Sequence, residues 1–308
     1  MLTVIQTNHI SKNYNGFQAV QDVSLSIKEG EIYAFIGLNG AGKTTVIRML
    51  LGMIRPTHGA CYFNNQKVRL SNYHIWNQVG YIVETPHFYP ELTVEENLEI
   101  YRRLRLITDK NTVSSVMTQL NLTQYAHKKA KNLSLGNAQR LGIAKALLPM
   151  PKVLILDEPV NGLDPAGMVE IRALLQGLAF NHGVTILISS HLLSEVAKIA
   201  TKIGIIDKGQ LVQEIQSDKL NQLLHRHLLI STKDNNAALS KLLSAEYDAK
   251  LNEKGLIEIY NQQAIQHPDE VSRLLVYGSV PPTKLVVKEE NLESYFLRVI
   301  QKEEAITV

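Results

Sequence analysis

Nine consecutive residues near the amino terminus combine the residue types that bind phosphate. They are Gly37, Leu38, Asn39, Gly40, Ala41, Gly42, Lys43, Thr44 and Thr45, which fit the pattern G-x-x-x-x-G-K-[ST]. Glycines at this spacing let successive backbone N–H groups point toward one polyanion, which also lies at the positive end of a helix dipole. Lys43 is placed to reach the β- and γ-phosphates of a nucleoside triphosphate, and the Thr44 hydroxyl to hold Mg²⁺.

The flanking residues support a phosphate loop at this place. A strand-like run at 33–36 precedes the pattern, and a helix-like run at 46–51 follows it. A glycine turn with an unrelated lysine is the alternative interpretation. That alternative gives no reason for a strand before the turn and a helix after it, so we favour the phosphate loop.

Two carboxylates follow a second apolar run. Asp157 and Glu158 come directly after the four apolar residues at 153–156. Asp157 is placed to bind Mg²⁺ through water, and Glu158 to orient and deprotonate an attacking water. A solvated strand end is the alternative, but two adjacent carboxylates at the end of a buried strand repel each other at some cost. The pair therefore predicts hydrolysis of the bound triphosphate.

The elements that must position these groups alternate between strands and helices. Residues 1–36 read as short strands, and 86–150 as a mainly helical insert. Buried strands at 153–156 and 185–188 alternate with helices at 169–178 and 192–200, and a hairpin follows at 203–215, which predicts a parallel sheet covered on both faces. A small α/β appendage begins near residue 218. It has strands near 227–232, 256–260 and 284–288 and helices near 235–245, 268–277 and 290–301.

Composition limits the classes of protein that remain. Of 308 residues, 45% are hydrophobic and 20% charged, as in ordinary folded proteins. The net charge of +3 gives no electrostatic argument for a nucleic-acid partner. The single cysteine, Cys61, excludes an intrachain disulfide and favours a reducing compartment. The amino terminus lacks a signal pattern, and the apolar runs are strand-sized, so we expect another chain to cross any membrane that this protein serves.

Five short patterns occur in an order that resembles one family. They are the phosphate loop, Leu-Ser-x-Gly at 133–136, the apolar run ending in Asp157 and Glu158, Asn161-Gly162-Leu163-Asp164, and Ser189-Ser190-His191. The same order is seen in the ATP-binding subunits of ABC transporters, and the resemblance covers residues 1 to about 215. It implies a P-loop NTPase fold of the α/β class, with an antiparallel β subdomain and a helical subdomain at about 86–150. The expected domains are therefore 1–217, the nucleotide-binding domain, and 218–308, a small accessory α/β domain.

The resemblance implies a role for each matching residue within one subunit. Tyr14 would stack on the adenine of ATP, and Gly37–Thr45 would hold its phosphates. Asp157 would serve Mg²⁺ and Glu158 would act as the general base. His191 would hydrogen-bond the γ-phosphate and the attacking water.

Other matching residues would act on a second copy of the chain. Ser134 and Gly136 would contact the γ-phosphate of the nucleotide bound to that copy, and Asp164 would lie at the same interface. Two ATP molecules would then be buried between two head-to-tail subunits. Closure on ATP and opening after hydrolysis would supply the working stroke.

Two departures from the family narrow the resemblance. Glu84 stands where the family usually has a glutamine that reaches the metal and the lytic water, so we assign Glu84 to the catalytic and metal-binding groups. Leu135 and Asn137 stand where glycine and glutamine are more usual. Glu84 and Leu135 occur together in ATPases of peptide-antibiotic exporters of the bacitracin-resistance and lantibiotic-immunity type.

This narrower resemblance implies partners and a location. The expected partners are a second copy of the chain, an integral membrane permease and, through it, an antimicrobial peptide cargo, with no nucleic acid. The segment 87–89 would lie where the permease docks, or would form aromatic packing within the helical insert. The expected location is the cytoplasmic face of a bacterial cell membrane.

Two other functions remain as alternatives. A soluble ABC-type ATPase acting on ribosomes or DNA is the first, although the chain has one ATPase unit and no sustained heptads. A P-loop kinase or GTPase switch is the second, and the Leu-Ser-x-Gly segment and His191 argue against it.

Overall fold

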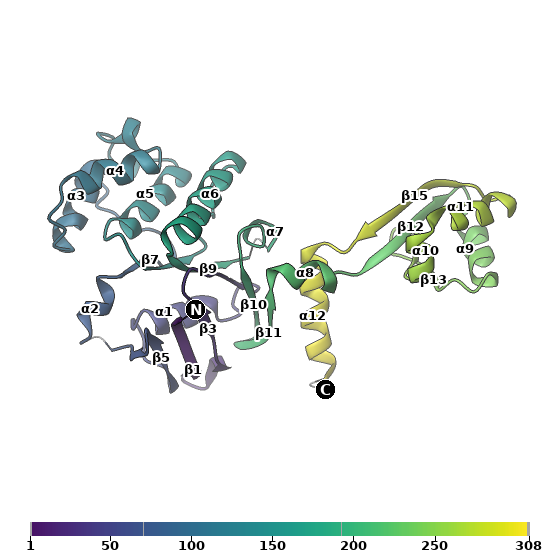
Figure 1. The fold of residues 1–308 in the computed structure, drawn as a ribbon, viewed down its shortest axis with the longest axis horizontal. Coiled ribbons are helices and arrows are strands. Elements are labelled where there is room, and N and C mark those ends of the chain that lie inside the picture. Colours follow the sequence, from purple (N-terminus) through teal and green to yellow (C-terminus); the bar gives the residue numbers. More distant parts are fainter. Residues whose placement is uncertain (1, 70, 192, 307–308) are drawn as a thin grey trace. The chain divides into compact units, whose positions relative to one another are not determined.

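The structure is a computed structural model that describes residues 2–69, 71–191 and 193–306. By its internal contacts the chain divides into two compact units, one ending at Asp218 and one beginning at Lys219 (Figure 1). This division falls one residue after the domain boundary expected from the sequence. None of the helices within the described ranges is long and apolar enough to span a bilayer.

A six-stranded sheet forms the centre of the first unit. Its order is β11-β10-β4-β9-β8-β7, and all neighbours are parallel except β10 and β11, which form an antiparallel hairpin. Every residue of β4 and β8 is buried, as is typical of strands at the centre of a parallel sheet. The strands are β4 (Ile32–Ile36), β7 (Val79–Ile82), β8 (Val153–Asp157), β9 (Thr185–Ser190), β10 (Lys202–Asp207) and β11 (Gln210–Gln216). The expected parallel sheet is confirmed.

Three helices follow strands of this sheet. They are α1 (Lys43–Leu50), α6 (Pro165–His182) and α7 (Leu193–Val196). Helix α6 begins after the N-cap Asp164 and ends at Gly183, whose φ of 67° is the left-handed conformation that closes many helices. The helix expected at 192–200 is shorter in the structure: α7 ends at Val196 and the chain continues in turns. Leu192 lies outside the described residues.

A second, antiparallel sheet precedes and follows the phosphate loop in sequence. Its order is β2-β1-β5-β6, with β3 also paired to β1. Its strands are β1 (Thr3–Tyr14), β2 (Phe17–Val23), β3 (Ser26–Lys28), β5 (His58–Phe63) and β6 (Gln66–Lys67). Between β2 and β3 the buried residues Val23, Leu25 and Ile27 still alternate with exposed ones. The strand pairing is interrupted there, because the Thr7 hydroxyl donates to Val23 O at 3.0 Å and accepts from Leu25 N at 2.8 Å.

Helices dominate the segment between β7 and β8. They are α3 (Val94–Leu104), α4 (Asn111–Gln119), the 3₁₀ turns η1 (Thr123–Tyr125) and η2 (Ala130–Asn132), and α5 (Leu135–Leu147), while the short α2 (Tyr73–Trp76) precedes β7. Thr93 and Glu96 form the capping box that the sequence predicts at the start of α3. Helices α3, α4 and α5 contact one another and lie together in Figure 1. The expected helical subdomain is confirmed.

The second unit is a four-stranded antiparallel sheet with helices. The sheet order is β13-β14-β12-β15. Its apolar core includes Leu228 and Ile230 from β12 and Leu242 and Leu275 from the helices. Its elements are β12 (Arg226–Thr232), α9 (Asn235–Ser244), β13 (Ala249–Leu251), β14 (Ile257–Ile259), α10 (Gln262–Gln266), α11 (Pro268–Tyr277), β15 (Pro282–Glu289) and α12 (Leu292–Ile306). Helix α8 (Ser217–Leu223) contains the boundary between the units.

Candidate active site

The phosphate loop connects β4 to α1. It reaches α1 through Gly42, whose φ is 103°. A Cβ atom at Gly42 would lie 2.7 Å from Ala19 O of β2, so both the conformation and the space require glycine. The loop is also fixed to the hairpin β10–β11, because Gly209 N donates to Ala41 O at 3.0 Å. Neighbouring strands thus hold the loop in place.

Lys43 is held inside this loop. It is 6% exposed, and its Nζ donates to Gly37 O at 2.7 Å and to Leu38 O at 3.2 Å. Its Nζ also lies 3.8 Å from Glu158 Oε1. Burial lowers the pKa of Lys43, and the charges of Glu158 and Asp157 act in the opposite direction. The loop therefore carries a cation whose position is fixed by the backbone that would surround a phosphate.

Thr44 and Asp157 place two oxygen donors side by side. The Thr44 hydroxyl donates to Asp157 Oδ2 at 2.8 Å, and the Ser189 hydroxyl donates to Asp157 Oδ1. Asp157, at the end of β8, is 2% exposed. A hydroxyl and a carboxylate are the hard ligands with which phosphate-binding proteins hold Mg²⁺, which takes its other ligands from phosphate oxygens and water. The donor set therefore fits Mg²⁺.

Glu158 turns away from β8 toward Lys43 and His191. Its φ is 51°, an uncommon conformation for a residue with a side chain and one that clusters at functional sites. Its Oε2 lies 2.8 Å from His191 Nδ1. Gln139 on α5 also contacts this residue, because its Nε2 donates to the backbone carbonyl of Glu158 at 3.4 Å. The structure thus brings together Lys43, Asp157, Glu158 and His191 as the sequence predicts, and adds Gln139, which no sequence pattern indicated.

The Leu-Ser-x-Gly segment forms the start of α5 on the surface. Ser134 is the N-cap of α5, and its Oγ accepts from Asn137 N at 3.3 Å. Leu135 packs directly on Gly162, where a Cβ atom would lie 2.3 Å from Leu135 Cδ2. Within the described residues, no hydrogen bond joins Ser134 or Gly136 to the phosphate loop. Their predicted contact with a second copy's nucleotide stays a prediction.

Asp164 and Tyr14 have local contacts that the sequence analysis did not anticipate. The Asp164 carboxylate caps α6 by accepting from Gly167 N at 3.0 Å, and Pro165 occupies the first helical position. The sequence Asp-Pro before an apolar helix could have revealed this cap. Tyr14, at the end of β1, is 42% exposed, and the Lys12 ammonium lies 4.9 Å from its ring centre. Stacking of Tyr14 on adenine stays a prediction.

Glu84 lies beyond the end of β7 and pairs with α1. Its φ is 57°, and its Oε1 lies 2.6 Å from Arg48 Nη2. The structure therefore gives Glu84 a cationic partner that the sequence analysis missed. No local pattern indicates this pair, because Arg48 and Glu84 are 36 residues apart in sequence. Three further predicted loop residues lie as follows: Asn39 and Gly40 are exposed, and Thr45 is half-buried.

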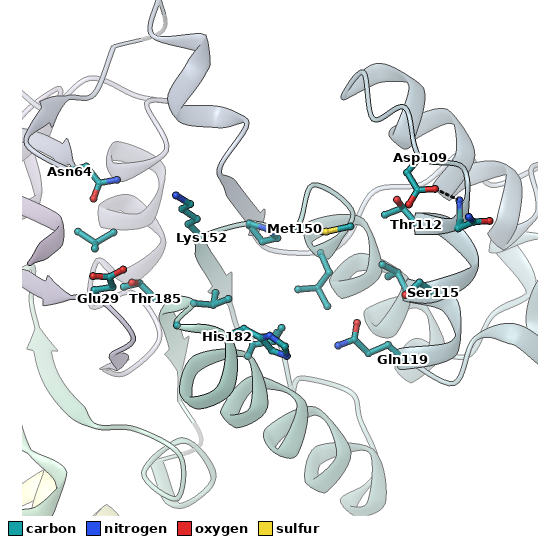
Figure 2. A pocket seen from close by; sticks show the side chains of 18 of the residues that line it. Glu29, Asn64, Asp109, Thr112, Ser115, Gln119, Met150, Lys152, His182 and Thr185 are labelled. Atoms are coloured by element: carbon teal, nitrogen blue, oxygen red, sulfur yellow. Dashed lines mark hydrogen bonds between the residues drawn. The ribbon is translucent and has the colours of Figure 1, made fainter. Parts of the chain in front are cut away.

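A cavity of about 810 Å³ lies elsewhere in the first unit (Figure 2). Its lining includes Lys152, His182 and Thr185, which lie at or just before the amino ends of β8 and β9. Parallel strands place all their carboxyl ends at one edge, where the phosphate loop, Asp157 and Glu158 lie. The cavity is therefore at the opposite edge from the phosphate loop and is not the nucleotide site.

The fold and the site together define a class of protein. The chain has a glycine loop with a buried lysine between a parallel strand and a helix. It also has a carboxylate at the end of another strand of the same sheet. These are the parts of a P-loop NTPase. The glutamate that follows that carboxylate, paired with a histidine, indicates an ATPase that hydrolyses its nucleotide.

Comparison with known proteins identifies the family. The family model for ABC transporters matches residues 20–161. Over 303 residues, 97% of this chain and 98% of the relative, the chain is 39% identical to the bacitracin transport ATP-binding protein BcrA of Bacillus licheniformis. It is 34% identical to the lantibiotic transport ATP-binding protein SrtF of Streptococcus pyogenes, over 75% of this chain and all of SrtF. The chain therefore belongs to the ATP-binding proteins of ABC transporters.

Solved structures support the same conclusion. An ATP-binding subunit of an ABC transporter superposes with a TM-score of 0.64 at 28% identity, covering 72% of this chain and 92% of that one. A bacterial ABC transporter cassette solved as a dimer gives a TM-score of 0.64 at 25% identity, over 69% and 98%. The resemblance inferred from the five motifs is confirmed, and the protein is an ABC-type ATPase.

Proposed function

We propose that this chain hydrolyses ATP to drive export of an antimicrobial peptide, of the bacitracin or lantibiotic type, through a separate membrane permease. The observation that carries the proposal is the similarity to BcrA over 97% of the chain, which includes the second unit. The similarity to SrtF extends it to lantibiotics. The named relatives are transport proteins, which favours this function over an ATPase acting on ribosomes or DNA.

The site suggests which step of ATP binding and hydrolysis each residue would perform. Bound Mg²⁺, held by Thr44 and Asp157, would neutralise charge on the phosphates. Lys43 would exchange its bonds to the loop carbonyls for phosphate oxygens, which is favourable because charge-assisted hydrogen bonds are the stronger kind. Glu158 would accept a proton from the attacking water, and His191 would orient that water.

A second copy of the chain would complete each hydrolytic site. The start of α5, with Ser134 and Gly136, is on the surface and is separate in sequence from the phosphate loop. An exposed helix start is a ready site for the γ-phosphate of another subunit's nucleotide. Asp164 caps α6 close to that surface, since Leu135 packs on Gly162 in the loop before it. This arrangement supports the head-to-tail dimer.

The segment before α3 exposes one aromatic side chain that a partner at the membrane could contact. Asn97, 3% exposed, donates to Tyr89 O at 3.1 Å and accepts from Tyr89 N at 2.8 Å. Tyr89 itself is 55% exposed, whereas the Phe88 ring lies 5.5 Å from Lys145 Nζ. We assign Tyr89 to docking of the permease on the cytoplasmic face of the cell membrane, and Phe88 to packing within the helical subdomain.

Resistance assays test the proposed cargo. The chain is expressed together with the proposed membrane permease in a susceptible bacterium, which is exposed to bacitracin and to a lantibiotic. We expect the inhibitory concentration of at least one peptide to rise severalfold, and the rise to disappear with Lys43→Ala. An unchanged inhibitory concentration for both peptides, with all subunits present in the membrane fraction, would contradict the proposal.

Replacement of Glu84 tests its link to transport. We expect Glu84→Gln to keep ATP binding but to change the number of ATP molecules hydrolysed per peptide exported, because Glu84 follows β7 beside the hydrolytic carboxylates and leads into the helical subdomain. Hydrolysis and peptide export by the reconstituted complex are measured together. Equal hydrolysis and equal export by both proteins would show that the carboxylate has no special role.

A further inference from the structure

One face of α1 contacts the ends of two neighbouring strands. Thr44 and Arg48 are four residues apart, so they lie on the same face of the helix, about one turn or 6 Å from each other. Thr44 donates to Asp157 at the end of β8. Arg48 donates to Glu84, two residues beyond the end of β7. Because β7 and β8 are parallel neighbours with Ile82 opposite Leu156, the two carboxylates leave adjacent strands at one edge of the sheet.

We propose that Arg48 is a positioning residue that competes with Mg²⁺ for the Glu84 carboxylate. The inference rests on the proposed function, because it takes Glu84 as a metal-side residue. In the structure the Glu84 carboxylate is 2.6 Å from Arg48, and Thr44 and Asp157 bond to each other. Arg48 contacts one oxygen of the carboxylate, Oε1, and holds the Glu84 side chain about one helical turn from Thr44, so the ion pair opposes a move of that carboxylate toward Mg²⁺.

The exposure of the ion pair suits such a competition. The side chains of Arg48 and Glu84 are 39% and 57% exposed. Ion pairs in that range contribute little to stability because water screens them, so this pair can break and re-form. Glu84 also holds a positive φ of 57°, a conformation that adds local strain at functional sites. The pair is therefore strong enough to bias the position of Glu84 and weak enough to be displaced.

The charges around the site explain why a cation is needed at this place. Asp157, Glu158 and Glu84 bring three carboxylates to the carboxyl edge of β7 and β8. Lys43 lies beside Glu158, at 3.8 Å, and cannot also serve Glu84. A glutamine at position 84 would need no partner, whereas a glutamate repels the neighbouring carboxylates and the incoming triphosphate. Arg48 supplies the compensating charge until the metal arrives.

Nucleotide affinity measured with and without metal tests the competition. The full-length chain, Arg48→Gln, Glu84→Gln and the double variant are titrated with ATP, once in Mg²⁺ and once in excess EDTA. If Arg48 competes with Mg²⁺, Arg48→Gln should tighten ATP binding in Mg²⁺ by about two- to fivefold, the range expected from a surface ion pair. In EDTA it should not tighten ATP binding and should weaken it, because Glu84 then repels the triphosphate without a compensating cation. The tightening should be absent when Arg48→Gln is combined with Glu84→Gln.

A control variant separates this effect from a general loss of surface charge. Arg273 forms a comparable exposed pair with Asp269, at 2.9 Å, in the second unit. Arg273→Gln should leave ATP binding unchanged in both buffers. Two results would overturn the inference but not the ATPase assignment. One is that Arg48→Gln tightens ATP binding equally in the unmodified chain and in the Glu84→Gln variant. The other is that it does not tighten ATP binding at all. Failure of the unmodified chain to bind ATP in either buffer would overturn the ATPase assignment together with the inference.

Discussion

Glu158→Gln should lower the rate of ATP hydrolysis by a factor on the order of 10²–10⁴, the usual contribution of a general base, while ATP affinity stays close to that of the unmodified chain. Glu158 does not bond to Thr44 or Asp157 in the described contacts. It does pair with Lys43 at 3.8 Å, but Lys43 keeps its bonds to Gly37 O and Leu38 O, so the replacement leaves the phosphate and metal ligands in place. An amide cannot accept the proton of the attacking water. Phosphate release in steady state and ATP titration measure the two effects separately.

The same variant should accumulate as an ATP-bound dimer, because hydrolysis is the step that opens the interface. Light scattering after size-exclusion chromatography with ATP and Mg²⁺ measures this. Glu195 offers a matched control: its side chain is 21% exposed against 22% for Glu158, and it pairs with Arg172 and Lys198 away from the phosphate loop. Glu195→Gln should hydrolyse ATP normally. A Glu158→Gln protein that stays monomeric in ATP, or that hydrolyses at an ordinary rate, would contradict the mechanism.

The parts of the site that the sequence predicts are those formed by residues that are adjacent in sequence. The phosphate loop is one continuous pattern, and its glycines are required by local backbone geometry, as Gly42 shows. Asp157 and Glu158 follow a strand whose apolar run already marks it as buried. In both cases the chemistry and the element that positions it lie within one short stretch, so no knowledge of the tertiary fold is needed.

Contacts between distant residues are the parts that the sequence did not predict. Arg48 and Glu84 are 36 residues apart and belong to no common pattern, so their pairing depends on how α1 packs against the sheets. The break between β2 and β3 has a similar origin, because the Thr7 side chain replaces strand hydrogen bonds from across the sheet. The alternate burial of Val23, Leu25 and Ile27 still follows the sequence, so this tertiary contact changes the strand pairing and not the periodicity.

Short elements were also missed, for a different physical reason. Strand β13 has three residues and α10 has five, too few to show a period of two or of 3.6 residues by themselves. Strand β14 is equally short but was recognised, because apolar residues at 256, 257, 259 and 260 flank a single charged one. The longer elements of the same unit, such as β12 and α11, carry enough apolar positions to be recognised. Helix α7 was predicted too long rather than missed. Apolar residues continue to Ala200, but the helix ends at Val196.

Mixing two inactive variants should restore hydrolysis if each site is shared between two copies. Lys43→Ala removes the loop cation, and Gly136→Arg places bulk at the exposed start of α5. Gly136 tolerates a side chain locally, since its Cβ would meet the nearest atom at 3.5 Å, an ordinary contact distance. Each variant alone has two defective sites per dimer and should be nearly inactive.

A mixed dimer has one site with both defects and one site with neither, because the phosphate loop of one copy faces α5 of the other. An equal mixture should therefore recover up to about a quarter of the unmodified activity, since half of randomly formed symmetric dimers are mixed and each has one working site. The control places both substitutions in one chain and mixes it equally with unmodified protein. Its mixed dimers have no intact site, so activity should fall to about a quarter, whereas chains that act independently would keep about half. No recovery in the first mixture, with dimers present, would show that a single chain contains a complete hydrolytic site.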